Sequence, residues 1–80
     1  MYVALEARGQ GLARTLLSEV IRRARELPSL EQITLSVVSD NAPACNLYLS
    51  AGFEVFGTER HATKDGDRYL DEDHMILWLV

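Results

Sequence analysis

Apolar side chains recur at helical spacing in the first third of the chain. They stand three or four positions apart, with arginines and other polar residues opposite them, which predicts an amphipathic helix over about Gly11–Leu27. Two acid–base pairs at a spacing of four, Glu19 with Arg23 and Arg22 with Glu26, fit its exposed side. The apolar positions expected to face the core are Leu12, Leu16, Val20 and Ala24, with Ala13, Leu17 and Ile21 beside them.

A second strand-and-helix pair follows in the middle of the chain. Residues 33–38 alternate and are rich in β-branched side chains, which predicts a strand. Residues 39–41 are Ser, Asp and Asn, all helix-capping types, and Pro43 is tolerated in a first turn. These signals predict a helix that runs to about Ser50 and is closed by Gly52.

Strand patterns occupy the two ends of the chain. Residues 1–5 resemble the end of a strand, and residues 53–56 predict a short one. Asp65-Gly66 predicts a hairpin turn. Residues 74–80 are apolar on both faces and predict a strand in the centre of a sheet. The element order predicts an α/β fold with two helices and a mixed parallel and antiparallel sheet.

Composition narrows the function classes. With 80 residues, 48% hydrophobic and 25% charged, the chain is expected to be a single globular domain. A net charge of -4 weighs against nucleic-acid binding. No apolar run approaches the ~20 residues that span a bilayer. One cysteine and no Cys/His framework indicate neither an internal disulfide nor a metal, and fit the cytoplasm.

The main candidate site is the glycine-rich turn Arg8-Gly9-Gln10-Gly11-Leu12-Ala13, between the first strand and the first helix. The first N–H groups of a helix lack internal partners and carry partial positive charge, so they bind phosphates. No Ser, Thr, Asp or Asn caps this helix, as expected if a ligand takes those groups. The dinucleotide fingerprint fails because Arg14 replaces its third glycine, and the Lys of a P-loop is missing. A tight turn without a ligand is the alternative.

A second motif turns these observations into a family resemblance. It reads Asn41-Ala42-Pro43-Ala44-Cys45-Asn46-Leu47-Tyr48-Leu49-Ser50-Ala51-Gly52-Phe53. Together the two motifs resemble GNAT N-acetyltransferases. The family's Gln/Arg-x-x-Gly-x-Gly/Ala is met by Arg8, Gly11 and Ala13. Its Asn-x-x-Ala-x-x-Leu-Tyr-x-x-x-Gly-Phe is met by Asn41, Ala44, Leu47, Tyr48, Gly52 and Phe53. The likeness covers essentially all 80 residues as the C-terminal half of the domain, with the N-terminal strands and helices missing.

The resemblance implies a reaction and a set of site residues. The reaction is direct attack of an amine on acetyl-CoA, with no metal. Tyr48 would be the general acid that protonates the departing thiolate, since a phenol with a pKa of about 10 stays protonated at neutral pH. A core aromatic is the alternative for Tyr48, and a simple N-cap is the alternative for Asn41. Cofactor binding is expected from Val3, Arg8, Gly9, Gln10, Gly11, Leu12, Ala13, Arg14 and Asn41.

Structural or surface roles are expected for the other reactive side chains. Cys45 is expected to be a small buried residue, and His61 and His74 to lie at the surface. Residues 71–73, Asp71-Glu72-Asp73, are expected to form a solvated charge cluster, with attraction of a cationic acceptor as the alternative. The general base is unassigned.

The missing front of the domain leads to an expectation about partners. The strand edge around Tyr2 and Val3 would be unpaired. Residues 1–80 are therefore expected to be a fragment, a truncated domain or an oligomer whose other chain covers that edge. Two rival functions remain: a catalytically inactive CoA-binding fragment, and an interaction module that has lost the cofactor. The acceptor stays open among small amines, antibiotics, polyamines and protein N-termini.

Overall fold

The computed structural model describes residues 1–2 and 10–80, with residues 10–12 as backbone only. Within these residues helices and strands follow one another in the predicted order. The elements are α1 (Gln10–Arg25), β1 (Gln32–Val38), α2 (Ala42–Ser50), β2 (Glu54–Asp65) and β3 (Arg68–Trp78). Both predicted helices are confirmed, with bounds within two residues of those expected.

The three described strands form one sheet in the order β1-β3-β2, with both neighbouring pairs antiparallel. β3 is therefore central, as its apolar sequence predicts. On the outer edge of β1, Tyr2 forms a parallel bridge with Thr34, and the Thr34 N–H donates to the Met1 carbonyl at 2.6 Å. This single bridge adds a parallel pairing at the edge of the antiparallel sheet. The remainder of the predicted first strand, including Val3, lies outside the described residues.

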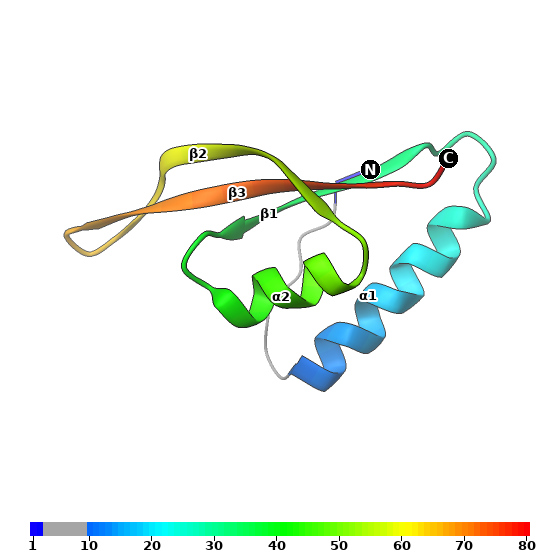
Figure 1. Cartoon of the computed structure of the whole chain (residues 1–80), viewed down its shortest axis with the longest axis horizontal. Helices are drawn as coiled ribbons and strands as arrows, with labels where there is room; N and C mark the ends of the chain where they lie inside the picture. Colours follow the sequence, from blue (N-terminus) through cyan, green and yellow to red (C-terminus); the bar gives the residue numbers. More distant parts are fainter. Residues whose placement is uncertain (3–9) are drawn as a thin grey trace.

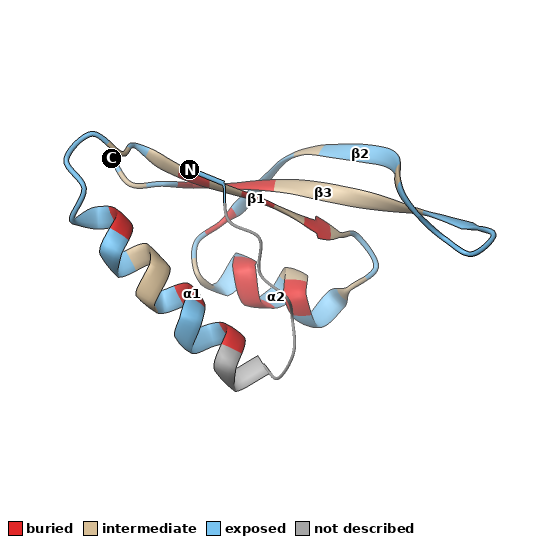
Figure 2. Ribbon diagram, turned by 180° about the vertical axis from the view of Figure 1, so that it is seen from behind, coloured by how far each residue is buried: buried red, intermediate tan, exposed pale blue. Residues whose placement is uncertain are grey.

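Both helices pack on the same face of the sheet (Figure 1). The side chains of β1 alternate between buried and half-buried along the whole strand, as expected of a sheet that is covered by helices on one face. Among the described residues, the largest fully buried side chains are Leu17 of α1, Ile33 of β1 and Met75 of β3. They lie where α1 faces the centre of the sheet. Figure 2 shows the buried residues on the facing sides of the helices and the sheet, whereas the far half of the β2–β3 hairpin is exposed.

The buried stripe of α1 differs from the predicted one. Ala13, Leu17 and Ala24 are buried, with Val20 half-buried between them. Leu16 is 47% exposed, so its predicted core position is wrong. The apolar residues of α1 are too many for one stripe, and packing against the sheet selects the row through residues 13, 17, 20 and 24.

The last hairpin is longer than its hydrophobic pattern predicts. β2 runs to Asp65 instead of ending near residue 56, and β3 begins at Arg68 instead of at residue 74. The Asp65↔Arg68 pair closes the hairpin at the predicted turn, where Gly66 has φ 62°. The additional residue pairs of the hairpin are joined by backbone hydrogen bonds and lie beyond the helices (Figure 1). The helices do not cover them, so their sequence shows no hydrophobic pattern.

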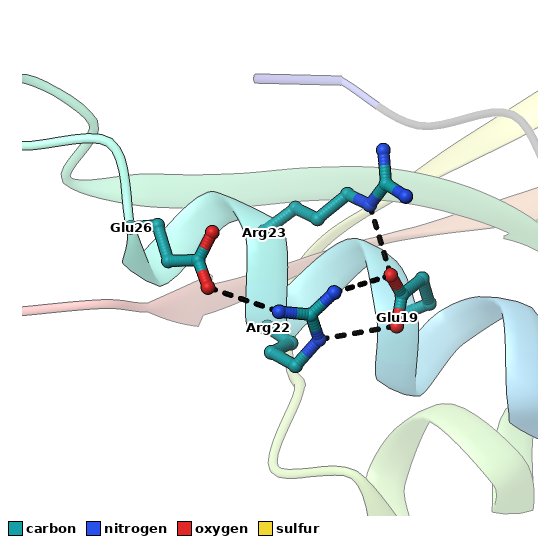
Figure 3. A network of polar contacts seen from close by, with 4 residues as sticks. All are labelled: Glu19, Arg22, Arg23 and Glu26. Carbon is teal, nitrogen blue, oxygen red and sulfur yellow. Dashed lines mark hydrogen bonds and ion pairs between the residues drawn. The ribbon is translucent and has the colours of Figure 1, made fainter.

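The outer side of α1 carries the predicted ion pairs (Figure 3). Arg23 Nε lies 2.9 Å from Glu19 Oε1, and Arg22 Nη1 lies 2.9 Å from Glu26 Oε1. Arg22 also reaches back to Glu19 with Nη2 at 2.5 Å. Hydrogen bonds from Arg22 and Arg23 lower the pKa of Glu19 to about 2. These side chains are largely exposed, so the pairs contribute little to stability.

Candidate functional site

The start of α1 has the character expected of an anion site. The helix begins at Gln10, inside the predicted loop, and its first turn contains no acidic residue. The free backbone N–H groups there face no carboxylate of that turn. Ala13 is 4% exposed and packs into the core, so a small side chain holds this turn close to the sheet. Arg8, Gly9 and Val3 lie outside the described residues, and of Gln10, Gly11 and Leu12 only the backbone is described.

An open groove lies between the start of α1 and the outer side of α2. It has a volume of about 470 Å³ and is lined by Arg14, Ala42, Pro43, Asn46, Leu47 and Ser50. Among the described residues of this lining, Arg14 is the one with a charged side chain. Within residues 1–2 and 10–80 no carboxylate forms an ion pair with Arg14, whereas Arg22, Arg23 and Arg68 each have one. An exposed guanidinium at the edge of a groove attracts an anionic ligand.

Asn41 caps the N-terminus of α2. Its side-chain Oδ1 accepts from the Ala44 N–H at 3.3 Å, and its carbonyl accepts from the Cys45 N–H at 3.0 Å. Pro43 stands in the first turn, as predicted. At the other end Gly52 has φ 102°, the left-handed conformation expected of a glycine after a helix. Asn41 is thus an N-cap, which was the alternative role considered for it. Its contact with a cofactor stays a prediction.

Tyr48 lies on the buried side of α2 and is 4% exposed. No hydrogen bond of its hydroxyl is found among the described residues, and no fully buried side-chain oxygen or nitrogen there lacks a partner. Burial raises the pKa of Tyr48 above its usual value of 10, with a smaller contribution from Cys45. Tyr48 is a neutral hydrogen-bond donor at physiological pH.

Cys45 is half-buried one helical turn before Tyr48. Its Sγ lies 3.8 Å from the Val38 carbonyl oxygen. Burial raises the pKa of the thiol, and the negative charge of Asp73 raises it further. A protonated thiol is a poor nucleophile, so this environment agrees with the predicted packing role.

The acidic residues of β3 differ from the solvated cluster that the sequence predicts. Asp73 Oδ1 accepts from Ser39 Oγ at 2.9 Å and from Thr58 Oγ1 at 2.8 Å, which joins the end of β1 to β2. Asp71 Oδ1 accepts from the His61 backbone N–H at 3.0 Å. Asp71, Glu72 and Asp73 are half-buried acceptors within the sheet. Glu72 accepts from Thr63 Oγ1, and hydrogen bonds from Thr63 and Ser36 lower its pKa.

Two features of the surface escape sequence reasoning. Asn46 and Ser50 line the groove. Their spacing of four places them on one side of the helix, and this was the one sequence signal that could have predicted their position. His61 sits in a bulge of β2 with φ 55° and stacks on Tyr69 with ring centroids 4.8 Å apart. It lines a second cleft of about 350 Å³ with Arg68 and Asp71 among its neighbours. Strained backbone at a bulge has no signature in this sequence.

Comparison with known proteins defines the class to which this fold and site belong. Residues 1–53 match the acetyltransferase (GNAT) family. The chain belongs to this family, which confirms the resemblance stated from the sequence. Among its relatives is the L-amino acid N-acetyltransferase AaaT of Escherichia coli (strain K12), 35% identical over 69 residues, which cover 85% of this chain and 42% of the relative.

Solved structures give the same fold. The ribosomal-protein-S18-alanine N-acetyltransferase from Escherichia coli matches with a TM-score of 0.81 and 30% identity, covering 90% of this chain and 46% of that one. The protein yncA from Salmonella typhimurium, solved with its cofactor acetyl-CoA, matches with a TM-score of 0.80 and 32% identity, covering 92% of this chain and 42% of that one. The predicted fold class is confirmed. The chain spans less than half the length of these relatives.

Proposed function

We propose that this chain forms the acetyl-CoA-binding part of an N-acetyltransferase that acetylates an amine. The observation that carries the proposal is the start of α1. There the family motif meets a helix whose first turn has no acidic residue, and Arg14 follows without a carboxylate partner among the described residues. These residues fit the anionic phosphates of acetyl-CoA, since free N–H groups and a guanidinium both attract phosphate.

The residues of the chain have separate roles in the proposed reaction. Backbone N–H groups of residues 10–13 hold phosphate at the helix start, and Arg14 adds positive charge. Bound acetyl-CoA supplies an acetyl thioester whose carbonyl carbon accepts the amine nitrogen. A C–N bond forms as the C–S bond breaks. Tyr48 donates its hydroxyl proton to the departing sulfur, and the amine gives up a proton to solvent or to a base that is not yet assigned.

Tyr48 and Cys45 support direct transfer over a covalent enzyme intermediate. Burial raises the pKa of Tyr48, so the phenol keeps its proton at neutral pH and is available as a donor to the departing thiolate. Burial also raises the pKa of Cys45, which keeps it a thiol. The one sulfur nucleophile of the chain is therefore suppressed, while a proton donor lies one turn further along α2.

Titration of the 80-residue chain with acetyl-CoA by calorimetry tests the proposal. We expect saturable binding that Gly11→Glu weakens by about 100-fold, because a carboxylate at the helix start repels phosphate. Gly57→Glu is the matched control, since a Cβ at Gly57 meets no atom within 4 Å and the charge change is the same. Equal affinity of the two variants would contradict the assigned phosphate site.

The rival functions give different results in the same experiment. A folded chain that binds no acetyl-CoA is the outcome expected of an interaction module that has lost the cofactor. Saturable binding without turnover over a panel of small amines, polyamines and peptides is the outcome expected of an inactive CoA-binding fragment. Acetylation of any member of the panel supports the enzyme and identifies the acceptor class.

The sheet face opposite the helices favours further polypeptide as a partner. Phe56 contacts the His74 ring on that face, and Phe56 is 61% and Trp78 52% exposed. The Tyr2 hydroxyl meets Ser36 Oγ at 2.8 Å on the same face. We propose that the N-terminal half of the domain, or a second copy of the chain, covers these residues. Sedimentation of the chain alone and with a separately expressed N-terminal half distinguishes the two.

No described helix is long and apolar enough to cross a membrane, and a cytoplasmic location stays a prediction.

A further inference from the structure

The carboxylate of Asp73 lies where β1 leaves the sheet and the chain turns into α2. Its Oδ1 accepts from Ser39 Oγ at 2.9 Å and from Thr58 Oγ1 at 2.8 Å. Thr58 is already the strand partner of Asp73, so its hydrogen bond stays within the sheet. Ser39 follows the last residue of β1 and stands three residues before the first residue of α2. Its hydrogen bond therefore ties the entry of the helix to the central strand.

The connection from β1 to α2 is too short to absorb a displacement at Ser39. Asp40 and Asn41 alone separate Ser39 from α2, and Asn41 already caps the helix by accepting from the Ala44 N–H. The Ser39 N–H donates to the Asp71 carbonyl at 2.9 Å, so the main chain and the side chain of Ser39 both bond to β3. Because β3 is paired on both edges, it is a firm support for the start of the helix.

Asp73 also acts on the side of α2 that leads to Tyr48. Burial raises the pKa of the Cys45 thiol, and the negative charge of Asp73 raises it further, so the carboxylate lies close to this turn of the helix. Cys45 Sγ lies 3.8 Å from the carbonyl oxygen of Val38, the residue before Ser39. Tyr48 follows three residues after Cys45, about 4.5 Å further along the helix axis. A tilt of the start of α2 therefore moves the Tyr48 hydroxyl.

We infer that Asp73 is a positioning residue: through Ser39 it fixes the start of α2, and with it the place from which Tyr48 donates a proton. The inference rests on the proposed acetyl transfer and adds to it a residue that touches neither cofactor nor acceptor. A proton donor must lie within hydrogen-bond distance of the departing sulfur, and a misplacement of about 1 Å can lower a rate by about 100-fold. The proposed phosphate site belongs to α1, so its affinity does not depend on this anchor.

Two matched substitutions separate positioning from stability. Ser39→Ala and Thr58→Val each remove one hydroxyl from the same carboxylate oxygen, and both residues are exposed. We expect similar falls in melting temperature. With an accepted amine, kcat is expected to fall about tenfold in Ser39→Ala and less than about twofold in Thr58→Val, with the Kd for acetyl-CoA nearly unchanged in both. Ser39→Thr keeps the hydroxyl and is expected to restore kcat.

Two further readouts follow the position of α2 without turnover. Cys45 is the one cysteine of the sequence, so its alkylation by iodoacetamide reports on this helix alone. We expect several-fold faster alkylation in Ser39→Ala and an unchanged rate in Thr58→Val, since a loosened helix start exposes the thiol. The Tyr48 ring packs edge to face on Phe53, so its proton chemical shifts are sensitive to movement. They are expected to change in Ser39→Ala alone.

Each contrary outcome removes a different part of the account. Equal losses of kcat in Ser39→Ala and Thr58→Val would show that Asp73 only stabilises the sheet. Faster alkylation of Cys45 with unchanged kcat would leave Asp73 as an anchor of α2 but refute its effect on Tyr48. Unchanged alkylation and unchanged Tyr48 shifts in a folded Ser39→Ala variant refute the inference and leave the proposed function intact. Failure of the folded, unaltered chain to bind acetyl-CoA refutes the proposed function and the inference together.

Discussion

The ring of Tyr48 meets the ring of Phe53 edge to face, with centroids 6.1 Å apart and planes inclined at 64°. The two residues belong to one helix and the loop that leaves it, and the Phe53 N–H also donates to the Tyr48 carbonyl at 3.1 Å. The aromatic contact fixes the Tyr48 ring without using its hydroxyl. Packing and proton donation are thus carried by different parts of one side chain and can be tested apart.

Tyr48→Phe separates these two roles. The ring is retained and no hydrogen bond to a described residue is lost, so we expect the melting temperature to change little. Loss of the proton donor is expected to lower kcat by about 100-fold in an assay with an accepted amine, while the Kd for acetyl-CoA changes by less than about twofold. Tyr69→Phe, at an exposed tyrosine of the hairpin, is the control. An unchanged kcat would show that Tyr48 is only a core aromatic.

The pH dependence of turnover provides a second test of Tyr48. Burial raises its pKa above 10, so the hydroxyl stays protonated through neutral and mildly alkaline pH. Loss of activity by deprotonation of Tyr48 is therefore expected only above about pH 10. A fall of kcat below pH 9 that disappears in Tyr48→Phe would contradict the raised pKa.

Substitution of Asn41 tests its cap and its cofactor contact together. Asn41→Ala removes the oxygen that accepts the Ala44 N–H and is expected to lower the free energy of unfolding by about 1 kcal/mol. Asn41→Asp keeps a capping oxygen and is expected to restore that stability. It lacks the amide N–H donor, so we expect it to bind acetyl-CoA several-fold more weakly. Full affinity in a stable Asn41→Asp variant would leave Asn41 with the cap alone.

Gly52→Ala is expected to lower the free energy of unfolding by about 1–2 kcal/mol. At φ 102° an L-residue is strained, and the new Cβ would lie 3.2 Å from Leu77 Cδ1. Gly57→Ala adds the same atom where nothing lies within 4 Å, and is expected to change stability by less than about 0.5 kcal/mol. Urea unfolding of both variants measures the difference, and a smaller loss at Gly52 than at Gly57 would refute it.

Glu19 gives the α1 surface a pH dependence in the acid range. Its folded pKa of about 2 lies below the ordinary 4.5, so its ion pairs stabilise the protein above about pH 4.5 and are lost as pH falls toward 2. Glu19→Gln is therefore expected to melt slightly lower than the unaltered chain at pH 7 and equally at pH 2. Glu31→Gln, at an exposed glutamate without an ion pair among the described residues, is expected to show no such difference. A gap that persists at pH 2 would exclude ionisation of Glu19 as its cause.

Secondary structure was predicted correctly where a residue type favours one particular backbone position. Asn41, Pro43 and Gly52 defined α2 because a cap, a first-turn proline and a left-handed glycine each fit few positions. Prediction failed where the three-dimensional context decides. Leu16 is as apolar as Leu17, and only packing against the sheet shows which of them is buried. The outer half of β2 carries polar residues on both faces, so its length depends on pairing with β3.

The candidate site divides in the same way. Tyr48 and Asn41 are recognisable from the family motif because their spacing on one helix is fixed. Asn46 belongs to the same motif segment, yet its place in the groove depends on α1 lying beside α2, which no local pattern states. Asp73 looked like a solvated charge because its two hydroxyl partners, Ser39 and Thr58, are distant in sequence.

β3 is the last of the described strands in the sequence and lies between the other two. During synthesis β1 and β2 therefore lack the strand that lies between them until β3 has left the ribosome, and Gln32 at the start of β1 pairs with Trp78, near the end of β3. Loops of this length close slowly, so the sheet is expected to form late and in one cooperative step. Once formed, β3 should have the backbone amides that exchange most slowly with deuterium, because it is hydrogen-bonded on both edges.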